Sequence, residues 1–136
     1  MIERTLSIIK PDGVERRLIQ QINEILFKRG LEVVKQILLV IPKDQAVELY
    51  KQHKLGSYFD RLIEYTISAP SMVQIIEGNH AVAVNRRIIG SSDPLRAAQG
   101  TIRQLYGIDL PRNTVHGSDS IEAADREIEI FFGEVK

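Results

Sequence analysis

The first part of the chain changes from an extended to a helical pattern of hydrophobic residues. Residues 5–9 alternate polar and apolar side chains and then become apolar, which predicts a strand that ends at Lys10. The next apolar residues recur at helical spacing as far as Gly30, namely Val14, Leu18, Ile22, Ile25 and Leu26. We therefore expect one helix here, begun by a capping box of Asp12 and Glu15.

The middle of the chain predicts two more strands with helices between them. Residues 31–41 are rich in β-branched side chains, which favours a strand. Residues 44–53 and 56–65 favour helices. Residues 72–76 predict another strand, and residues 77–79 a turn after it.

Residues 81–89 fit two interpretations. Their β-branched content favours a strand, whereas Ala81, Val84 and Ile88 would share one face of a helix. On such a helix Arg86 would lie away from the apolar face.

The last part of the chain holds a long irregular segment and a final helix. From Gly90 to Val115 apolar periodicity is weak, and such a segment within a compact domain is usually functional or mobile. Ser120 is then expected to cap a helix whose apolar stripe is Ile121, Ala124, Ile128 and Phe131. The alternation of strands and helices predicts an α/β sandwich in which helices cover a mixed sheet, with residues 1–136 in a single domain.

Composition narrows the classes of partner and chemistry. The 136 residues carry 18 basic and 18 acidic side chains, so no bulk charge indicates a nucleic-acid or membrane partner and any anion site must be local. Because the chain has no cysteine, disulfides, thiolate chemistry and cysteine-based zinc sites are excluded. The longest purely apolar run, residues 37–41, is too short to span a bilayer, and residues 1–5 do not look like a signal peptide. We expect a cytoplasmic protein.

Three cations could bind phosphate. Lys10 stands where a strand meets the start of a helix, and helix N-termini attract phosphate. Arg86 and Arg103 lie in or beside the irregular segment, and arginine binds phosphate with two hydrogen bonds. Taken alone, each cation is better explained as an ordinary residue: Lys10 as the end of a strand before a helix cap, and Arg86 and Arg103 as solvated side chains. Neither a P-loop nor a dinucleotide-binding glycine motif is present.

The segment N-T-V-H-G-S-D-S at residues 113–120 is the most informative one. Histidine can attack phosphorus and hold a phosphoryl group when a carboxylate or carbonyl engages its other ring nitrogen. Asp125 and Glu127 both flank the apolar stripe of the final helix, so helical spacing does not choose between them. His116 could instead be a hydrogen-bonded structural histidine. His53, His80 and His116 have no spacing typical of a metal site.

Four segments in order together resemble the nucleoside diphosphate kinase family, from residue 3 to about residue 132. They are E-R-T-L-S-I-I-K-P-D-G-V at 3–14, N-R-R-I-I-G-S-S-D-P at 85–94, G-T-I-R at 100–103 and the segment at 113–120. The resemblance implies a ferredoxin-like α+β sandwich, a four-stranded antiparallel sheet covered by helices. It also implies transfer of the γ-phosphoryl group of a nucleoside triphosphate, usually ATP, to a nucleoside diphosphate through a phosphohistidine.

The resemblance also implies roles for single residues. His116 matches the phosphorylated histidine, Glu127 rather than Asp125 matches the acid that bonds its other nitrogen, and Ser118 matches the serine of the H-G-S-D motif. The expected nucleotide contacts are Lys10, Tyr50, Tyr58, Arg86, Ser92, Arg103 and Asn113. Mg²⁺ is expected to arrive with the nucleotide, without a protein metal cage. The resemblance further implies a homo-oligomer, a tetramer or hexamer built from dimers, which the short C-terminal tail does not distinguish.

This chain departs from the family pattern around the nucleotide. Tyr58 replaces the usual base-stacking phenylalanine, Gly56-Ser57 replaces Arg-Pro, and Ser92-Asp93 replaces Thr-Asn. Gln52 stands where an acidic residue is common. We expect an active enzyme with weaker nucleotide affinity. The alternatives are a nucleotide-binding homologue without turnover and a nucleic-acid-binding module, which the zero net charge disfavours.

Overall fold

One antiparallel sheet organises the computed structural model, which describes residues 1–133. Its strands are β1 (Ile2–Ile9), β2 (Glu32–Leu39), β3 (Ser71–Asn79) and β4 (Val115–Gly117), in the order β2-β3-β1-β4. Every neighbouring pair runs antiparallel. This confirms the sheet that the family resemblance implies. The mixed sheet predicted from the alternation of elements is wrong, because that alternation does not specify strand direction.

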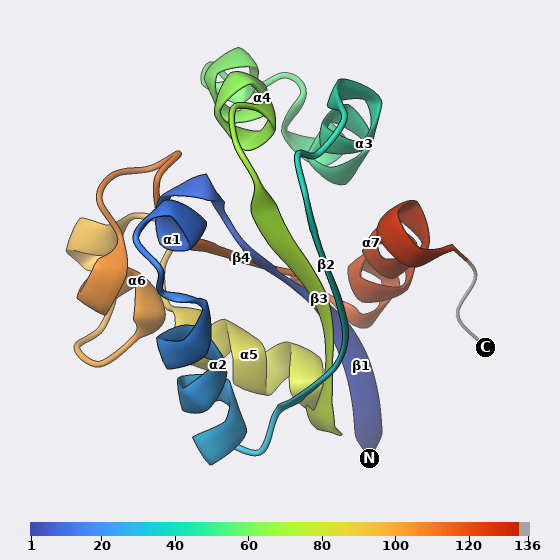
Figure 1. The fold of residues 1–136 in the computed structure, drawn as a ribbon, viewed down its shortest axis with the longest axis vertical. Coiled ribbons are helices and arrows are strands. Elements are labelled where there is room, and N and C mark those ends of the chain that lie inside the picture. Colours follow the sequence, from blue (N-terminus) through green and yellow to red (C-terminus); the bar gives the residue numbers. More distant parts are fainter. Residues whose placement is uncertain (134–136) are drawn as a thin grey trace.

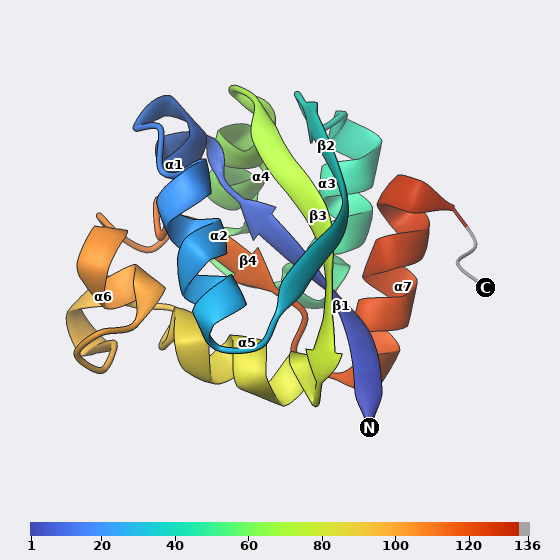
Figure 2. The ribbon, with the colours of Figure 1, turned by 60° about the horizontal axis from the view of Figure 1, so that its bottom comes forward.

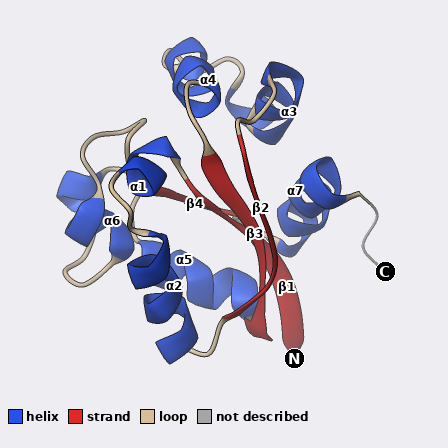
Figure 3. Cartoon of the chain, viewed as in Figure 1, coloured by secondary structure: helices blue, strands red, loops and turns tan. Residues whose placement is uncertain are grey.

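Helices cover both faces of this sheet. They are α1 (Pro11–Glu15), α2 (Ile19–Lys28), α3 (Lys43–Leu49), α4 (Phe59–Ile67), α5 (Ala81–Ile89), α6 (Ile102–Tyr106) and α7 (Ile121–Phe132), with 3₁₀ turns η1 (Lys51–His53) and η2 (Pro94–Arg96). Figure 1 shows α3 and α7 on one side of the strands and α2 and α5 on the other, and Figure 3 separates the element types by colour. Within residues 1–133, no helix combines the length and the apolar character needed to cross a bilayer.

Alternation along the central strands builds two apolar cores. On β3, Val73 and Ile75 pack with residues of α3, α4 and α7, whereas Ile76 packs with α2 and α5. Successive side chains of a strand point to opposite faces, so one central strand serves both layers. Figure 2 shows these layers from a lower viewpoint, with α2 and α5 on one side of the strands and α3 and α7 on the other. The short strand β4 lies at the edge beside β1, opposite the other edge strand β2.

The helix expected from Asp12 to Gly30 is two helices, and the predicted capping box is wrong. Arg17 has φ 61°, a left-handed conformation that ends α1 before α2 begins. Asp12 lies inside α1 rather than at its N-cap, which is Lys10. Its carboxylate accepts hydrogen bonds from the side chains of Tyr65 and Thr114, so it is not available for capping.

Two other predictions change in the structure. Residues 81–89 form helix α5, which removes the ambiguity about them. The turn predicted at residues 77–79 is wrong, because these residues continue β3 and pair with the first residues of β1. Gly78 is needed there for close packing: a Cβ atom at this position would lie 2.4 Å from the carbonyl oxygen of Gly30.

We predict that Gly78→Ala destabilises the fold by about 1–3 kcal/mol, because the added methyl meets backbone that cannot rotate away. Urea unfolding measures the change in the free energy of unfolding. In the control Gly56→Ala, the added Cβ would meet only the carbonyl oxygen of His53, at 3.0 Å on an exposed turn, so the loss should be smaller. Equal midpoints for Gly78→Ala and the wild type would contradict this packing argument.

Candidate active site

The predicted site residues converge on one cavity of about 160 Å³ beside β4. Most of the residues expected from the family resemblance line it, namely Lys10, Tyr50, Tyr58, Arg86, Ser92, Arg103, Asn113, His116 and Glu127. Ser118 is the exception: its side chain is buried behind the cavity, where it bonds Glu127. The cavity therefore collects residues from η1, α4, α5, α6, β4, α7 and the loops between the elements, including Lys10 directly after β1.

His116 is held by the carboxylate that the resemblance selected. Its Nε2 lies 2.7 Å from Oε1 of Glu127, and the Ser118 hydroxyl donates to the same oxygen over 2.9 Å. Glu127 is 1% exposed, whereas Asp125 is exposed. With Nε2 on the carboxylate, Nδ1 is the ring nitrogen left to react, and no hydrogen-bond partner contacts it within residues 1–133.

The sheet fixes the backbone around His116. In the register of β4 with β1, His116 lies opposite Ile8, between pairs made by Val115 and Gly117. A Cβ atom at Gly117 would lie 2.5 Å from the Asn85 amide nitrogen, so this glycine allows α5 to pack against β4. The glycine that the sequence placed beside the histidine therefore serves helix packing.

Lys10 and Arg103 are buried cations. Nζ of Lys10 donates to Oδ1 of Asn113 over 2.8 Å. Burial, and next the nearby charge of Arg103, lower the pKa of Lys10 to about 7, although Asp12 opposes the change. Burial is also the main cause that lowers the pKa of Arg103 to about 10; Tyr50 acts against this change and the charge of Arg86 acts with it. Cations desolvated in this way are stabilised by an anionic ligand.

Arg103 also ties the irregular segment together. Its two terminal nitrogens donate to the carbonyl oxygens of Gly90 and Val115, each over 2.9 Å. Asn113 donates from its amide to the carbonyl oxygen of Ser92 over 2.8 Å. Arg86 is exposed, on the cavity side of α5, as expected for a helix over residues 81–89. The segment that lacks apolar periodicity is thus ordered by polar side chains.

Two tyrosines frame the histidine and the mouth of the cavity. The ring of Tyr50 meets His116 edge to face, with centroids 5.4 Å apart. Lys10 Nζ lies 5.9 Å from the centroid of the same ring. Tyr58 precedes α4 and also lines a second cavity of about 310 Å³, together with Arg61 and Leu110. Both cavities therefore meet at Tyr58.

Asp93 and Gln52, two residues at which this chain departs from the family pattern, each contact neighbouring residues in the structure. The Asp93 carboxylate accepts a hydrogen bond from the backbone nitrogen of Leu95 over 3.0 Å and lies 3.9 Å from Arg96. Leu95 and Arg96 both belong to η2, so the negative charge of Asp93 interacts with that turn. It lines the second cavity rather than the one containing His116. Gln52 donates to Asp119 over 3.4 Å at the cavity wall. The weaker affinity expected from these departures stays a prediction.

Asp119, Tyr65 and Thr114 were not assigned roles from the sequence. Asp119 brings an exposed carboxylate to the cavity, and its place in the H-G-S-D motif was the available signal. The side chains of Tyr65 and Thr114 both donate hydrogen bonds to Asp12, outside the cavity lining. These contacts join segments that are distant in the sequence, so no local sequence pattern predicts them. Among the described residues, no three His, Asp or Glu side chains gather to hold a metal ion.

Comparisons with known proteins agree with this geometry. The family model described as nucleoside diphosphate kinase matches residues 3–136. Two bacterial proteins named nucleoside diphosphate kinase are each 45% identical to this chain. The protein from Staphylococcus epidermidis aligns over 131 residues, which are 96% of this chain and 88% of the relative. The protein from Hydrogenovibrio crunogenus aligns over 136 residues, 100% and 96% of the two chains.

A solved structure matches in fold as well as sequence. A nucleoside diphosphate kinase from Halobacterium salinarum, solved in complex with CDP, superposes with a TM-score of 0.93 at 39% identity and covers 98% of this chain and 90% of its own. A family match over nearly the whole chain and relatives at this identity leave one assignment, and the chain belongs to the nucleoside diphosphate kinase family.

Proposed function

We propose that this protein transfers the γ-phosphoryl group of a nucleoside triphosphate, usually ATP, to a nucleoside diphosphate through a phosphohistidine at His116. Membership in the family supports the reaction. One observation supports the nucleophile: His116 faces a cavity lined by cations while its Nε2 is bonded to buried Glu127. The homologue without turnover is disfavoured, because the proposed nucleophile, its carboxylate partner and the three candidate phosphate-binding cations all line this cavity.

In the first half-reaction, the lone pair of Nδ1 attacks the γ-phosphorus. The bond from this phosphorus to the bridging oxygen breaks, and the nucleoside diphosphate leaves with the electron pair. Glu127 keeps the proton on Nε2 and stabilises the positive charge that the ring gains. In the second half-reaction a terminal oxygen of the acceptor diphosphate attacks the same phosphorus and the N–P bond breaks. Ser118 orients Glu127 by donating to its carboxylate.

Lys10, Arg86 and Arg103 would neutralise the phosphate charges during both steps, since phosphoryl transfer depends mainly on positioning and charge stabilisation. Asn113 and Ser92 would contact the sugar and the phosphates, Tyr50 would support the histidine ring, and Tyr58 would stack on the base.

Mg²⁺ would accompany the nucleotide and supply charge neutralisation at the phosphates. The donor set fits a metal carried mainly by phosphate oxygens. Two carboxylates line the cavity. Glu127 is committed to hydrogen bonds with His116 and Ser118, so Asp119 is the one that would contact the ion or its water.

We also propose a homo-oligomer, a tetramer or hexamer built from dimers, and a cytoplasmic location. The open edge strand β2 supports self-association, because it and the residue after it expose apolar side chains, namely Val34, Ile37, Leu38 and Val40. Acidic and basic residues are equal in number, so no excess of positive charge favours a nucleic-acid partner, and the proposed function requires none.

The direct test mixes the protein with γ-labelled ATP and Mg²⁺ without an acceptor. We expect an acid-labile, alkali-stable label on the protein, which added GDP removes as labelled GTP. His116→Ala should carry no label, and His80→Ala, an exposed histidine outside the cavity containing His116, should be labelled normally. Absence of label on the folded wild type would contradict the proposal.

Glu127→Gln should slow formation of the phosphoenzyme on the order of a hundredfold, because the neutral amide no longer stabilises the charged ring. Quench-flow measurement of the labelled enzyme gives this rate. The control Glu129→Gln changes an exposed residue of the same helix and should leave the rate unchanged. A wild-type rate for Glu127→Gln would rule out the role assigned to this carboxylate.

Nucleotide binding at about pH 8 should take up a proton at Lys10. In the free protein its pKa is about 7, lowered from 10.5 by burial, so the amine is mostly neutral at that pH. Adjacent phosphates favour the protonated form and raise the pKa. Calorimetric titration with ADP in buffers of different ionisation enthalpy measures the uptake, which should shrink at about pH 6 and be smaller in Lys10→Met. Equal uptake by the wild type and this variant at about pH 8 would exclude Lys10 as the source.

A further inference from the structure

A strained turn lies directly before the strand that carries the histidine. Thr114 has φ 76°, and the backbone nitrogen of Val115 donates to the carbonyl oxygen of Asn113 over 2.9 Å. Together these define a γ-turn with a positive-φ central residue, the rare and strained form. A β-branched residue disfavours this conformation especially strongly. The surrounding structure must therefore hold Thr114 in place.

The segment after β1 provides this restraint. The Thr114 hydroxyl donates to Oδ2 of Asp12 over 2.8 Å, and its carbonyl oxygen accepts from the backbone nitrogen of Lys10 over 2.8 Å. The Cγ2 methyl of Thr114 packs on Gly13, where an added Cβ would approach it to 3.1 Å. Thr114 is 0% exposed, so water cannot replace these contacts.

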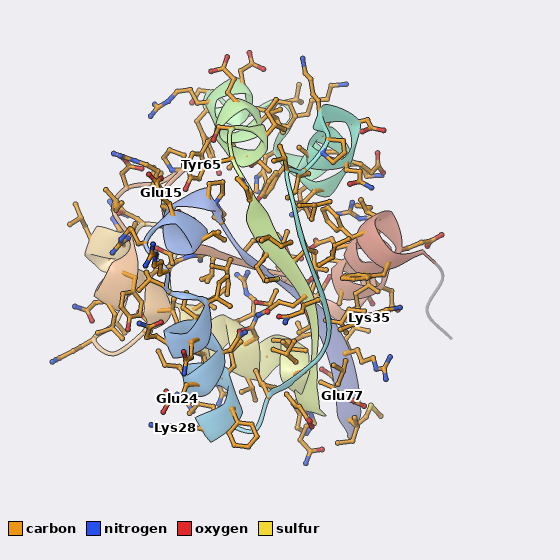
Figure 4. The ribbon with its side chains drawn as sticks, viewed as in Figure 1. Glu15, Glu24, Lys28, Lys35, Tyr65 and Glu77 are labelled. Atoms are coloured by element: carbon orange, nitrogen blue, oxygen red, sulfur yellow. The ribbon has the colours of Figure 1, made fainter. Side chains whose placement is uncertain are left out.

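Asp12 is in turn braced by Tyr65. The Tyr65 hydroxyl donates to Oδ1 of Asp12 and accepts from the Asp12 backbone nitrogen over 2.7 Å. Tyr65 lies between α4, which carries it, and α1 (Figure 4). Burial and the adjacent carboxylate raise the pKa of Tyr65, so its hydroxyl stays a donor. Arg16 also lies 3.7 Å from Oδ2 of Asp12, the oxygen that accepts from Thr114, so both carboxylate oxygens of Asp12 have partners.

The turn sets the place of the residues on its two sides. Asn113, immediately before it, accepts from Lys10 and donates to Ser92 at the cavity. His116, two residues after it, is independently fixed by the β1–β4 register and by Glu127. Loss of the turn would therefore disturb the Lys10–Asn113 pair more than the histidine.

We propose that Tyr65 and Asp12 are positioning residues that hold Thr114 in the γ-turn and thereby align the Lys10–Asn113 pair with the phosphates of the nucleotide. The proposal rests on the phosphoryl transfer proposed above. Neither residue is expected to touch the nucleotide, because the cavity is lined by Lys10 and Asn113 and not by Asp12, Tyr65 or Thr114. Tyr65 links helix α4 to the phosphate end of the cavity, and Tyr58 precedes the same helix.

The test compares variants that remove only hydroxyl groups. Tyr65→Phe and Thr114→Val should each lower kcat/KM about tenfold, the effect of losing one hydrogen bond to a charged group. The loss should appear mainly as a higher KM for ADP and ATP, since His116 stays in place. Thr114→Ser keeps the donor and should restore most of the activity. Tyr106→Phe, a half-buried tyrosine outside the cavity, is the matched control and should behave as the wild type.

A double variant separates positioning from stability. Glycine adopts a positive φ without strain, so in the Thr114→Gly background the turn no longer needs its restraint. Adding Tyr65→Phe to Thr114→Gly should then change KM less than about twofold. The same substitution in the wild-type background, where Thr114 is present, should raise KM more. Equal effects of Tyr65→Phe in both backgrounds, or a lowered melting temperature with unchanged KM, would overturn the proposal.

The labelling reaction distinguishes this failure from failure of the proposed function. At saturating ATP the wild type, Tyr65→Phe and Thr114→Val should all reach full phosphohistidine labelling. A wild type that takes no label would contradict the transfer itself. Normal labelling together with normal KM in Tyr65→Phe and Thr114→Val would leave the transfer intact and contradict only the positioning role.

Discussion

The hydrogen bond between His116 and Glu127 is the contact on which the rest of the site depends. It links edge strand β4 to helix α7, and it uses Nε2, so Nδ1 is left without a hydrogen-bond partner among residues 1–133. A carboxylate that is 1% exposed is costly unless its oxygens are bonded, and here His116 and Ser118 share one oxygen while Arg126 lies 3.6 Å from the other. The same arrangement fixes the ring and prepares it to carry positive charge.

Several features around this contact lower the stability of the folded state. Lys10 and Arg103 are buried with lowered pKa values, and both would be better solvated at the surface. Thr114 adds backbone strain of about 1–3 kcal/mol, typical of a non-glycine residue held in the left-handed region. Two apolar cores on opposite faces of the sheet offset these costs. Strain and desolvation are thus concentrated where an anion would relieve them.

The sequence predicted the elements better than their junctions. Hydrophobic periodicity located β1, β2, β3 and the capped final helix, because burial on one face leaves a regular signal; Ser120 indeed accepts from the backbone nitrogen of Ala123. It did not predict the short strand β4, which begins where the segment expected to be irregular ends. It failed at Asp12 and at residues 77–79, where long-range contacts override local preference. A carboxylate three residues before another acid matches a capping box, and nothing nearby in the sequence reveals that Tyr65 and Thr114 bind it.

At the site, too, the sequence predicted which residues are present better than how long-range contacts hold them. Helical spacing left Asp125 and Glu127 equal, and the family resemblance selected the residue that the structure buries against His116. The resemblance could not find the γ-turn, because a backbone angle at Thr114 and its restraint by α4 are properties of the folded chain. Local chemistry offered candidate residues, the family resemblance selected among them, and packing between distant segments determined how they are held.

The identity of the phosphorylated nitrogen tests this account most directly. Phosphoprotein prepared with ¹⁵N-labelled histidine and ATP can be examined by ³¹P and ¹⁵N NMR, which distinguish the two phosphohistidine isomers. Because Glu127 occupies Nε2, the phosphorus should be bonded to Nδ1 of His116, with Nε2 still protonated. A phosphorus on Nε2, or on another residue, would contradict it.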